Sequence, residues 1–266
     1  MKIGFLGFGK MAKAIAYGLL QSNSSYQLYC YDIHPNTFSD FEQKNLIKII
    51  PNLQAIEEEC DILIFSVKPK DLKDVVTSCK GYDTKHYISI AAGISTKKIH
   101  EWNSHIKNLS RVMPNLGAFA KHSVSAIFSS KQETLNLTKS IFDNLGITIL
   151  IDNEELMHAI TGLSGSGPAY VFLFLQAMIE AGIREGLSYE LSYQASLHTI
   201  LGSVKALWEN NQKNQTLTHP ADWIKNVTSP GGTTIEGLVE LEKNHFKYAI
   251  YNAIHQATNK SKELGK

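Results

Sequence analysis

The sequence predicts an α/β fold in which a doubly wound, mostly parallel sheet is followed by an all-α domain. Strand-like and helix-like segments alternate over residues 1–151. The segment 61–65, Asp-Ile-Leu-Ile-Phe, is an apolar run of the kind that is buried in a parallel sheet. After Asp152 the apolar period becomes that of a helix, and no strand pattern follows. We therefore expect domains at 1–151 and 152–266.

The alternation places each element in order along the chain. Strands are expected at 2–6, 27–31, 61–65, 87–90, 109–113, 124–128 and 148–151. Helices are expected between them at 11–20, 36–45, 70–76 and 132–145. In the second half, helices are expected at 154–163, 169–184, 191–208, 221–227 and 246–264, with a glycine-rich interruption at 164–168 and a polar loop at 210–218.

The composition argues against several classes of protein. Apolar residues make up 43% of the 266 residues and charged residues 19%, which is typical of a globular chain with a sizeable core. With 26 Lys and Arg against 25 Asp and Glu, we expect no nucleic-acid partner and no membrane partner. The apolar run 169–183 is interrupted by Gln176 and Glu180 and is too short to span a bilayer. Three cysteines without CxxC spacing fit reduced thiols, so we expect a cytoplasmic protein.

A glycine motif follows the first expected strand. It matches GxGxxA between a strand and a helix, the arrangement that binds a dinucleotide in Rossmann-like folds, and reads Gly7-Phe8-Gly9-Lys10-Met11-Ala12. Gly7 would make the tight turn, and Gly9 would let a pyrophosphate approach the helix N-terminus. Ala12 would allow close packing of helix on strand. The motif predicts NAD(P)H as cofactor.

Asp32 ends the second expected strand, where a ribose-binding acid is expected. A carboxylate there binds a ribose 2′-hydroxyl and repels a 2′-phosphate. No arginine stands at Ile33 or His34 to receive that phosphate. On charge alone the site favours NADH over NADPH. The alternative is that Asp32 only caps the turn before His34-Pro35.

Two further loops are expected at the same edge of the sheet. Ser66-Val67-Lys68-Pro69 follows the strand at 61–65, and Ala91-Ala92-Gly93 follows the strand at 87–90. Ligands bind outside the carboxyl ends of the strands in open α/β sheets, so we interpret both loops as cofactor contacts. The alternative for Lys68 is a solvated surface lysine.

A proline–glycine turn lies in the helical half. Residues 227–238 read Val-Thr-Ser-Pro-Gly-Gly-Thr-Thr-Ile-Glu-Gly-Leu, which predicts a tight turn leading into a helix. Unpaired N–H groups and a partial positive charge at a helix start attract anions. One interpretation is a small-anion pocket made of backbone, to which Ser229, Thr233 and Thr234 add hydroxyl groups. The alternative is an ordinary helix cap with Ser or Thr at the N-cap.

The motifs that the sequence lacks narrow the chemistry. There is no HExxH, no HxH and no Cys/His cluster of ligand spacing, so we expect no metal. No general acid stands out, because lone histidines such as His158, His198 and His219 are more often structural. Hydride transfer to a protonated C=N needs a general acid less than transfer to a ketone does, since the iminium already carries the charge. Thr234 could orient the ring nitrogen or relay a proton to it, and a substrate carboxylate would lie on the amides of 231–234.

Six segments occur together in this order in one enzyme family. They are 3–12, 67–69, 91–94, Arg111-Val112-Met113-Pro114-Asn115, 161–170 (Thr-Gly-Leu-Ser-Gly-Ser-Gly-Pro-Ala-Tyr) and the turn at 227–238. The first is shared with many dehydrogenases, whereas the last two are specific. Over essentially its whole length the chain resembles pyrroline-5-carboxylate reductases. The resemblance implies reduction of 1-pyrroline-5-carboxylate to L-proline by NAD(P)H, the last step of proline biosynthesis. It also implies an N-terminal Rossmann-like domain and an all-α C-terminal dimerisation domain, in a homodimer that often assembles into rings of dimers.

The resemblance also implies residue roles. By position, the residues that look like cofactor contacts are Gly7, Phe8, Gly9, Lys10, Met11, Ala12, Ser66, Val67, Lys68, Pro69, Ala92 and Asn226. Those that look like substrate contacts are Ser229, Gly231, Gly232, Thr233 and Thr234, and Glu154 matches a position implicated in substrate binding. Many family members prefer NADPH and lack an acid at the position of Asp32, so the charge argument for NADH departs from the family habit.

Two other functions stay open. A 3-hydroxyacid dehydrogenase or another imine dehydrogenase of the same architecture would need a lysine in the cleft, for which Lys225 is the candidate. A dinucleotide-sensing module would bind cofactor without turnover and would use the helical domain to bind a partner protein. Apolar residues such as Leu173 and Phe174 fit either the core of that domain or a dimer interface.

Overall fold

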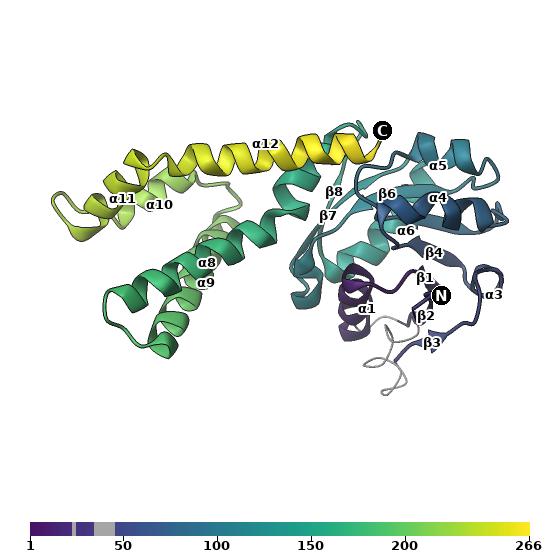
Figure 1. Cartoon of the computed structure of the whole chain (residues 1–266), viewed down its shortest axis with the longest axis horizontal. Helices are drawn as coiled ribbons and strands as arrows, with labels where there is room; N and C mark the ends of the chain where they lie inside the picture. Colours follow the sequence, from purple (N-terminus) through teal and green to yellow (C-terminus); the bar gives the residue numbers. More distant parts are fainter. Residues whose placement is uncertain (23–24, 35–45) are drawn as a thin grey trace. The chain divides into compact units, whose positions relative to one another are not determined.

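The computed structural model describes residues 1–22, 25–34 and 46–266, so the helix expected at 36–45 lies outside the described residues. One eight-stranded sheet forms the centre of the first half (Figure 1). Its strands are β1 (Lys2–Leu6), β2 (Gln27–Tyr31), β3 (Lys48–Ile49), β4 (Ile62–Phe65), β5 (His86–Ser89), β6 (Leu109–Met113), β7 (Ser123–Phe128) and β8 (Gly146–Leu150). The order is β3-β2-β1-β4-β5-β6-β7-β8, and neighbours are parallel except β6 and β7. The mostly parallel sheet is confirmed.

Two hydrophobic cores lie on the two faces of the sheet. Because side chains alternate along a strand, Ile62 and Ile64 of β4 point to one face and Leu63 and Phe65 to the other. The first pair packs with residues of α1 (Lys10–Gln21) and α6 (Gln132–Phe142). The second pair packs with residues of α3 (Leu53–Glu59), α4 (Pro69–Ser78) and α5 (Thr96–Trp102). Helices on both faces confirm the doubly wound fold.

The strand order creates a crevice at the carboxyl ends of β1, β2 and β4. The chain passes from β1 to β2 and β3 on one side and then crosses to β4 on the other side. Ligands bind at such a reversal of direction in open α/β sheets. The loops that follow these three strands therefore form the first place to look for a cofactor site.

The second half is helical throughout, as the sequence predicts. Its elements are α7 (Leu156–Ile160), the π-helix Thr161–Gly165, α8 (Gly167–Arg184), α9 (Tyr189–Asn214), α10 (Pro220–Asn226), α11 (Thr233–Lys243) and α12 (Phe246–Leu264). The glycine-rich interruption expected at 164–168 is shorter, because the π-helix continues to Gly165 and α8 begins at Gly167. Earlier in the π-helix, a Cβ on Gly162 would lie 2.4 Å from Thr258 Oγ1 and 2.7 Å from Ile254 O of α12, so close helix packing explains Gly162. The polar loop expected at 210–218 is shorter, because α9 continues to Asn214 and ends at Gln215 with φ 50°.

The chain forms two compact units, 1–168 with 254–266, and 169–253. The sequence places a boundary at 151/152, where the apolar period changes. The first turns of the helical half belong to the sheet-containing unit because they pack on the end of α12. His158 Nδ1 lies 2.9 Å from Ser261 Oγ, and Gly162 lies against Thr258.

Candidate active site

Gly7 fixes the turn between β1 and α1. Its N–H donates to Tyr31 O at 2.8 Å, and its carbonyl accepts from Ser66 Oγ at 2.6 Å. Its φ is +91°, and a Cβ there would lie 2.6 Å from Val67 Cγ1 and 2.9 Å from Val67 N. A side chain is therefore excluded both by backbone conformation and by the loop after β4.

Gly9 leaves the start of α1 open to an anion. It is the N-cap residue, no side chain caps the helix, and the first turn has no acidic residue. Among the described residues, no atom lies within 4 Å of a Cβ built on Gly9, beyond its chain neighbours and its own helix backbone. The unpaired amides and the helix dipole favour negative charge at this end. The surroundings of Gly9 fit the pyrophosphate of a dinucleotide.

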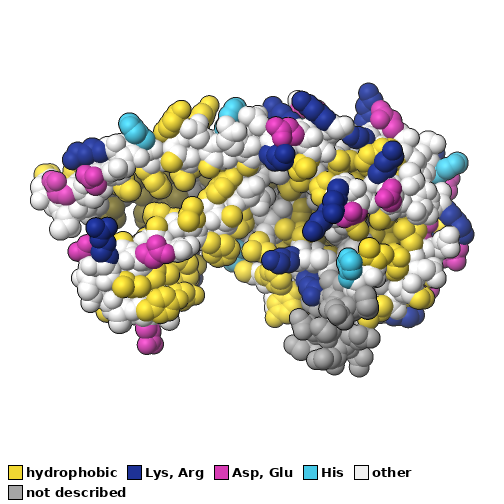
Figure 2. Space-filling view, viewed as in Figure 1, with side chains coloured by type: hydrophobic (Ala, Val, Ile, Leu, Met, Phe, Trp, Pro, Cys, Tyr) yellow, Lys and Arg dark blue, Asp and Glu magenta, His cyan; other side chains and the backbone are white. Residues whose placement is uncertain are grey.

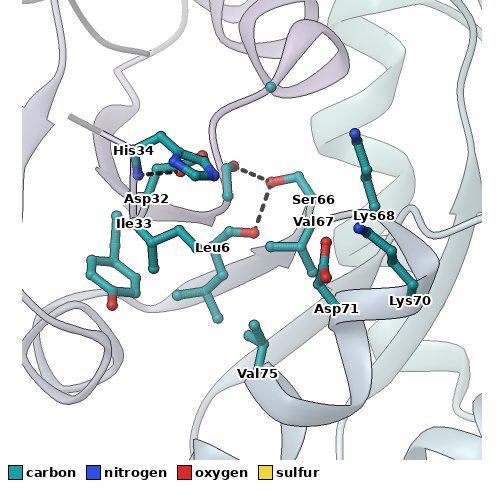
Figure 3. Close-up of a pocket in the computed structure, with 13 residues that line it drawn as sticks. Leu6, Asp32, Ile33, His34, Ser66, Val67, Lys68, Lys70, Asp71 and Val75 are labelled. Carbon is teal, nitrogen blue, oxygen red and sulfur yellow. Dashed lines mark hydrogen bonds between the residues drawn. The ribbon is translucent and has the colours of Figure 1, made fainter. Parts of the chain in front are cut away.

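A cavity of about 410 Å³ opens beside this turn (Figure 3). This volume is in the range of small-molecule sites. The cavity brings together six of the residues expected to bind cofactor, namely Gly7, Gly9, Asp32, Ser66, Val67 and Lys68. It is also lined by seven residues that the sequence reasoning missed, namely Leu6, Tyr31, Ile33, His34, Lys70, Asp71 and Val75. Most of these residues lie at or just after the carboxyl ends of β1, β2 and β4. That position in the sequence could have identified them as lining the cavity.

Other expected cofactor contacts do not line this cavity. Phe8 and Ala12 are buried in the core, and Lys10 and Met11 begin α1. Pro69 is the first residue of α4, and Ala92 packs beside Met113 and Met157. Asn226 ends α10 in the other unit.

The Asp32 carboxylate is held at the cavity by two backbone amides. Phe8 N donates to Oδ2 at 2.7 Å, and His34 N donates to Oδ1 at 2.9 Å. The second bond is the turn cap that was the alternative interpretation. The first bond ties the same carboxylate to the glycine motif. Asp32 therefore both caps its turn and carries negative charge beside the cavity.

Glu154 is engaged by two elements of the sheet unit. Thr96 donates to it twice, from N to Oε1 at 2.8 Å and from Oγ1 to Oε2 at 2.7 Å. Arg111 Nη1 of β6 donates to Oε1 at 3.1 Å. Arg111 is only 1% exposed, and burial lowers the pKa of its guanidinium while Glu154 opposes that shift. Among the described residues, no hydrogen bond is made by Arg111 Nε or Nη2.

Glu154 and Thr96 also line a second, more open cavity of about 480 Å³. That cavity shares none of its lining residues with the cavity beside the glycine motif. The Arg111–Glu154 pair was not predicted. Arg111 begins the segment 111–115, which is one of the six segments that resemble the reductase family, but the resemblance gave that segment no role.

The proline–glycine turn leads into α11 as predicted. Gly232 N donates to Ser229 O at 3.1 Å, and Gly231 has φ +65°. The N-cap of α11 is Gly232, and no side chain caps the helix. A Cβ on Gly232 would lie 2.4 Å from Ser229 Oγ. The interpretation as a helix cap by Ser or Thr is therefore wrong.

Thr233 and Thr234 begin α11, and both are exposed. The backbone amides of this first turn are not capped by any side chain. The arrangement can receive a small anion on backbone N–H groups, with hydroxyl groups beside it.

Comparison with known proteins decides the family. Residues 154–264 match the family model for pyrroline-5-carboxylate reductase dimerisation, and residues 2–93 match that for coenzyme F420-dependent NADP oxidoreductase. The pyrroline-5-carboxylate reductase of Methanosarcina acetivorans is 35% identical over 272 residues, covering 100% of this chain and 98% of its own length. The chain belongs to the pyrroline-5-carboxylate reductase family. The Arabidopsis thaliana reductase is also 35% identical, over 99% of this chain and 95% of its own length.

Solved structures of the family agree with this assignment. The crystal structure of Plasmodium falciparum pyrroline carboxylate reductase with NADP bound has a TM-score of 0.89 at 32% identity, covering 100% of this chain and 98% of that one. The Streptococcus pyogenes reductase has a TM-score of 0.86 at 29% identity, over 99% and 98%. The family's dimerisation model covers α7 to α12. The helical stretch Leu156–Arg184, which is long and apolar enough to cross a membrane by length and composition alone, lies inside that model.

Proposed function

We propose that this chain catalyses the NAD(P)H-dependent reduction of the C=N bond of 1-pyrroline-5-carboxylate to L-proline. The observation that carries the proposal is the uncapped start of α11, with Gly232 at the N-cap and Thr233 and Thr234 in the first turn. Such a turn binds a carboxylate through backbone amides and leaves hydroxyl groups for the ring. The cavity beside the glycine motif supports the binding of a dinucleotide as hydride donor.

In this proposal each residue of the turn has one task. The amides that follow Gly231 and Gly232 bind the substrate carboxylate, with Ser229 and Thr233 beside them. The Thr234 hydroxyl orients the ring nitrogen or relays a proton to it. The bound cofactor supplies the hydride, and Asn226 at the end of α10 contacts that cofactor. Positioning then accounts for much of the rate, because the iminium already carries the positive charge.

Glu154 is proposed to act on the substrate indirectly. Its carboxylate accepts hydrogen bonds from Thr96 and Arg111, so it holds the start of α5 to the middle of β6. We propose that it supports the loop at Ala92 on the cofactor side, a positioning role.

The cofactor is proposed to be NADH in preference to NADPH. The support is the Asp32 carboxylate, which two amides hold beside the cavity where a 2′-phosphate would have to lie. Oxidation of NADH and of NADPH, followed with 1-pyrroline-5-carboxylate as substrate, tests both points. If neither NADH nor NADPH is oxidised, the proposed reaction is wrong. Turnover of a hydroxy acid, with none of 1-pyrroline-5-carboxylate, would contradict it as well. A ratio in favour of NADPH would overturn only the role of Asp32.

Thr234→Val tests the chemistry of the turn. We expect cofactor affinity to be kept and turnover to fall by roughly 10²-fold or more, which is the scale of one positioned proton-transfer or hydrogen-bonding group. Thr216→Val, in the loop after α9, is the matched control, and we expect it to leave turnover unchanged. Near-normal turnover in Thr234→Val would remove the hydroxyl from the mechanism.

The assembly is proposed to be a homodimer through α7 to α12, able to form rings of dimers, in the cytoplasm. The support is the dimerisation model over 154–264 together with apolar helix faces that this chain leaves exposed. We infer that a second copy, rather than lipid, covers the apolar stretch Leu156–Arg184.

A further inference from the structure

We propose that Asp71 recognises the adenine base of the cofactor by accepting a hydrogen bond from its exocyclic amino group. The inference rests on the proposed use of an adenine dinucleotide and assigns a specificity-determining residue to the base. Asp71 lies in the first turn of α4 and lines the cavity next to the glycine motif.

The two ends of the cavity differ in chemistry. Gly7 and Gly9 form one end, where the open start of α1 fits a pyrophosphate. The Asp32 carboxylate, suited to a ribose hydroxyl, is bonded to Phe8 N of the same motif. The covalent order of a dinucleotide is pyrophosphate, ribose, base. The part of the cavity beyond Asp32 therefore receives the base.

The cavity has apolar walls suited to a flat aromatic ring. Ile33 and Val75 come from the segment after β2 and from α4, and Val67, after β4, packs against Gly7. Ile33 is 76% exposed, a large apolar surface that a stacked base would remove from water. Val67 and Val75 are half-buried at the same cavity.

Asp71 places an acceptor among these walls. Figure 3 shows its carboxyl group rising from the first turn of α4 toward Val67. Within the described parts of the chain, no hydrogen bond or ion pair engages this carboxylate. An ionised carboxylate only accepts hydrogen bonds. It is therefore matched to the amino group that adenine carries at C6.

Hypoxanthine carries a carbonyl at C6 instead of the amino group. A carbonyl oxygen facing the Asp71 carboxylate pairs two acceptors, which loses the hydrogen bond and adds repulsion. One charge-assisted hydrogen bond corresponds to roughly a tenfold difference in affinity at an exposed site. The wild-type protein is expected to bind NADH about tenfold more tightly than nicotinamide hypoxanthine dinucleotide in its reduced form.

The experiment measures the affinity of the full chain for both dinucleotides by titration calorimetry without substrate. In Asp71→Asn the side-chain amide can donate to a C6 carbonyl, so the two affinities should come within about twofold of each other. Asp74→Asn removes the same charge from the same helix at a residue that does not line the cavity, and it should keep the tenfold ratio. Thermal unfolding of each variant checks that the fold is retained.

The outcomes separate this inference from the proposed function. Equal affinity of the wild type for the two dinucleotides, or an unchanged ratio in Asp71→Asn, would overturn the role of Asp71 and leave the reductase proposal standing. Absence of NADH binding by the wild type would overturn both.

Discussion

Gly7 and Gly9 lie in the same turn but differ in backbone conformation and in the space available for a side chain. Gly7 has φ +91° and would place a Cβ against the backbone and side chain of Val67. Gly9 has φ −76°, which any residue adopts, and its Cβ would meet no atom of the described part of the chain within 4 Å. Gly7 is therefore needed for the fold, whereas Gly9 is needed for the approach of a ligand.

Substitution by alanine should separate these two roles. Gly9→Ala should leave the unfolding temperature unchanged and weaken NADH binding by roughly tenfold or more, because the methyl group occupies the approach of the pyrophosphate. Gly7→Ala should lose about 1–3 kcal/mol of stability through strain at positive φ. Thermal unfolding and NADH titration of both variants measure this. Wild-type affinity in Gly9→Ala would contradict the placement of the pyrophosphate.

His158 gives a pH dependence at the scale of one residue. The residue is 8% exposed, and burial, followed by the charge of Arg111, lowers the pKa of its imidazole in the folded state. The unfolded chain therefore binds this proton first as the pH falls. The stabilising contribution is complete above the unfolded value of about 6.5 and is lost as the pH falls below it.

The free energy of unfolding should thus be lower at pH 5 than at pH 7.5, and His158→Gln should make that difference smaller. Urea unfolding at both pH values measures it, with exposed His122→Gln as the comparison. A difference as large in His158→Gln as in the wild type would show that other groups account for it.

At the scale of elements, the Arg111–Glu154 pair joins three segments far apart in the chain. Arg111 is on β6, Thr96 begins α5, and Glu154 precedes α7. Removing one partner leaves a buried charge without its counter-ion, which costs about 3–5 kcal/mol. Replacing both by apolar residues removes that penalty. Losing one partner of the pair should therefore destabilise the packing of these elements more than losing both partners does.

A double-mutant cycle tests this. Glu154→Leu should lose about 3–5 kcal/mol of unfolding free energy, and Arg111→Met with Glu154→Leu should recover a large part of it. Urea denaturation gives these values. A direct substrate contact at Glu154 would instead raise KM and leave stability unchanged.

At the scale of the whole molecule, the unit 169–253 buries little of its own apolar surface. Only Ile179, Ser192 and Ser196 are buried in it, and Val171, Phe172, Leu173 and Phe174 of α8 are all exposed. Figure 2 shows hydrophobic side chains on the surface of these helices. A unit with so small a core needs further surface to cover it. The dimerisation model over the same residues indicates that a second copy supplies that surface.

Association should therefore depend on α8. Leu173, which is 66% exposed, becomes charged in Leu173→Asp, and we expect this variant to lose the dimer and to unfold at lower temperature. Leu46→Asp, outside the helical region, should stay dimeric. Sedimentation at micromolar concentration distinguishes the species. A wild-type protein that sediments as a stable monomer would contradict the dimer.

The sequence by itself determined the strands β1, β2, β4 and β6, the glycine motif and the turn before α11. These are local patterns, in which the period of apolar residues or the conformation of one glycine decides the structure. It missed β3, which has only two residues, and α3 and α5, which have seven residues each and, unlike α10, no proline at the first helical position to mark their start. Only the tertiary structure decided the bond from Phe8 N to Asp32, the partners of Glu154, and the place of Asp71 in the cavity. Each of these depends on the order of strands in the sheet, which brings together residues that are distant along the chain.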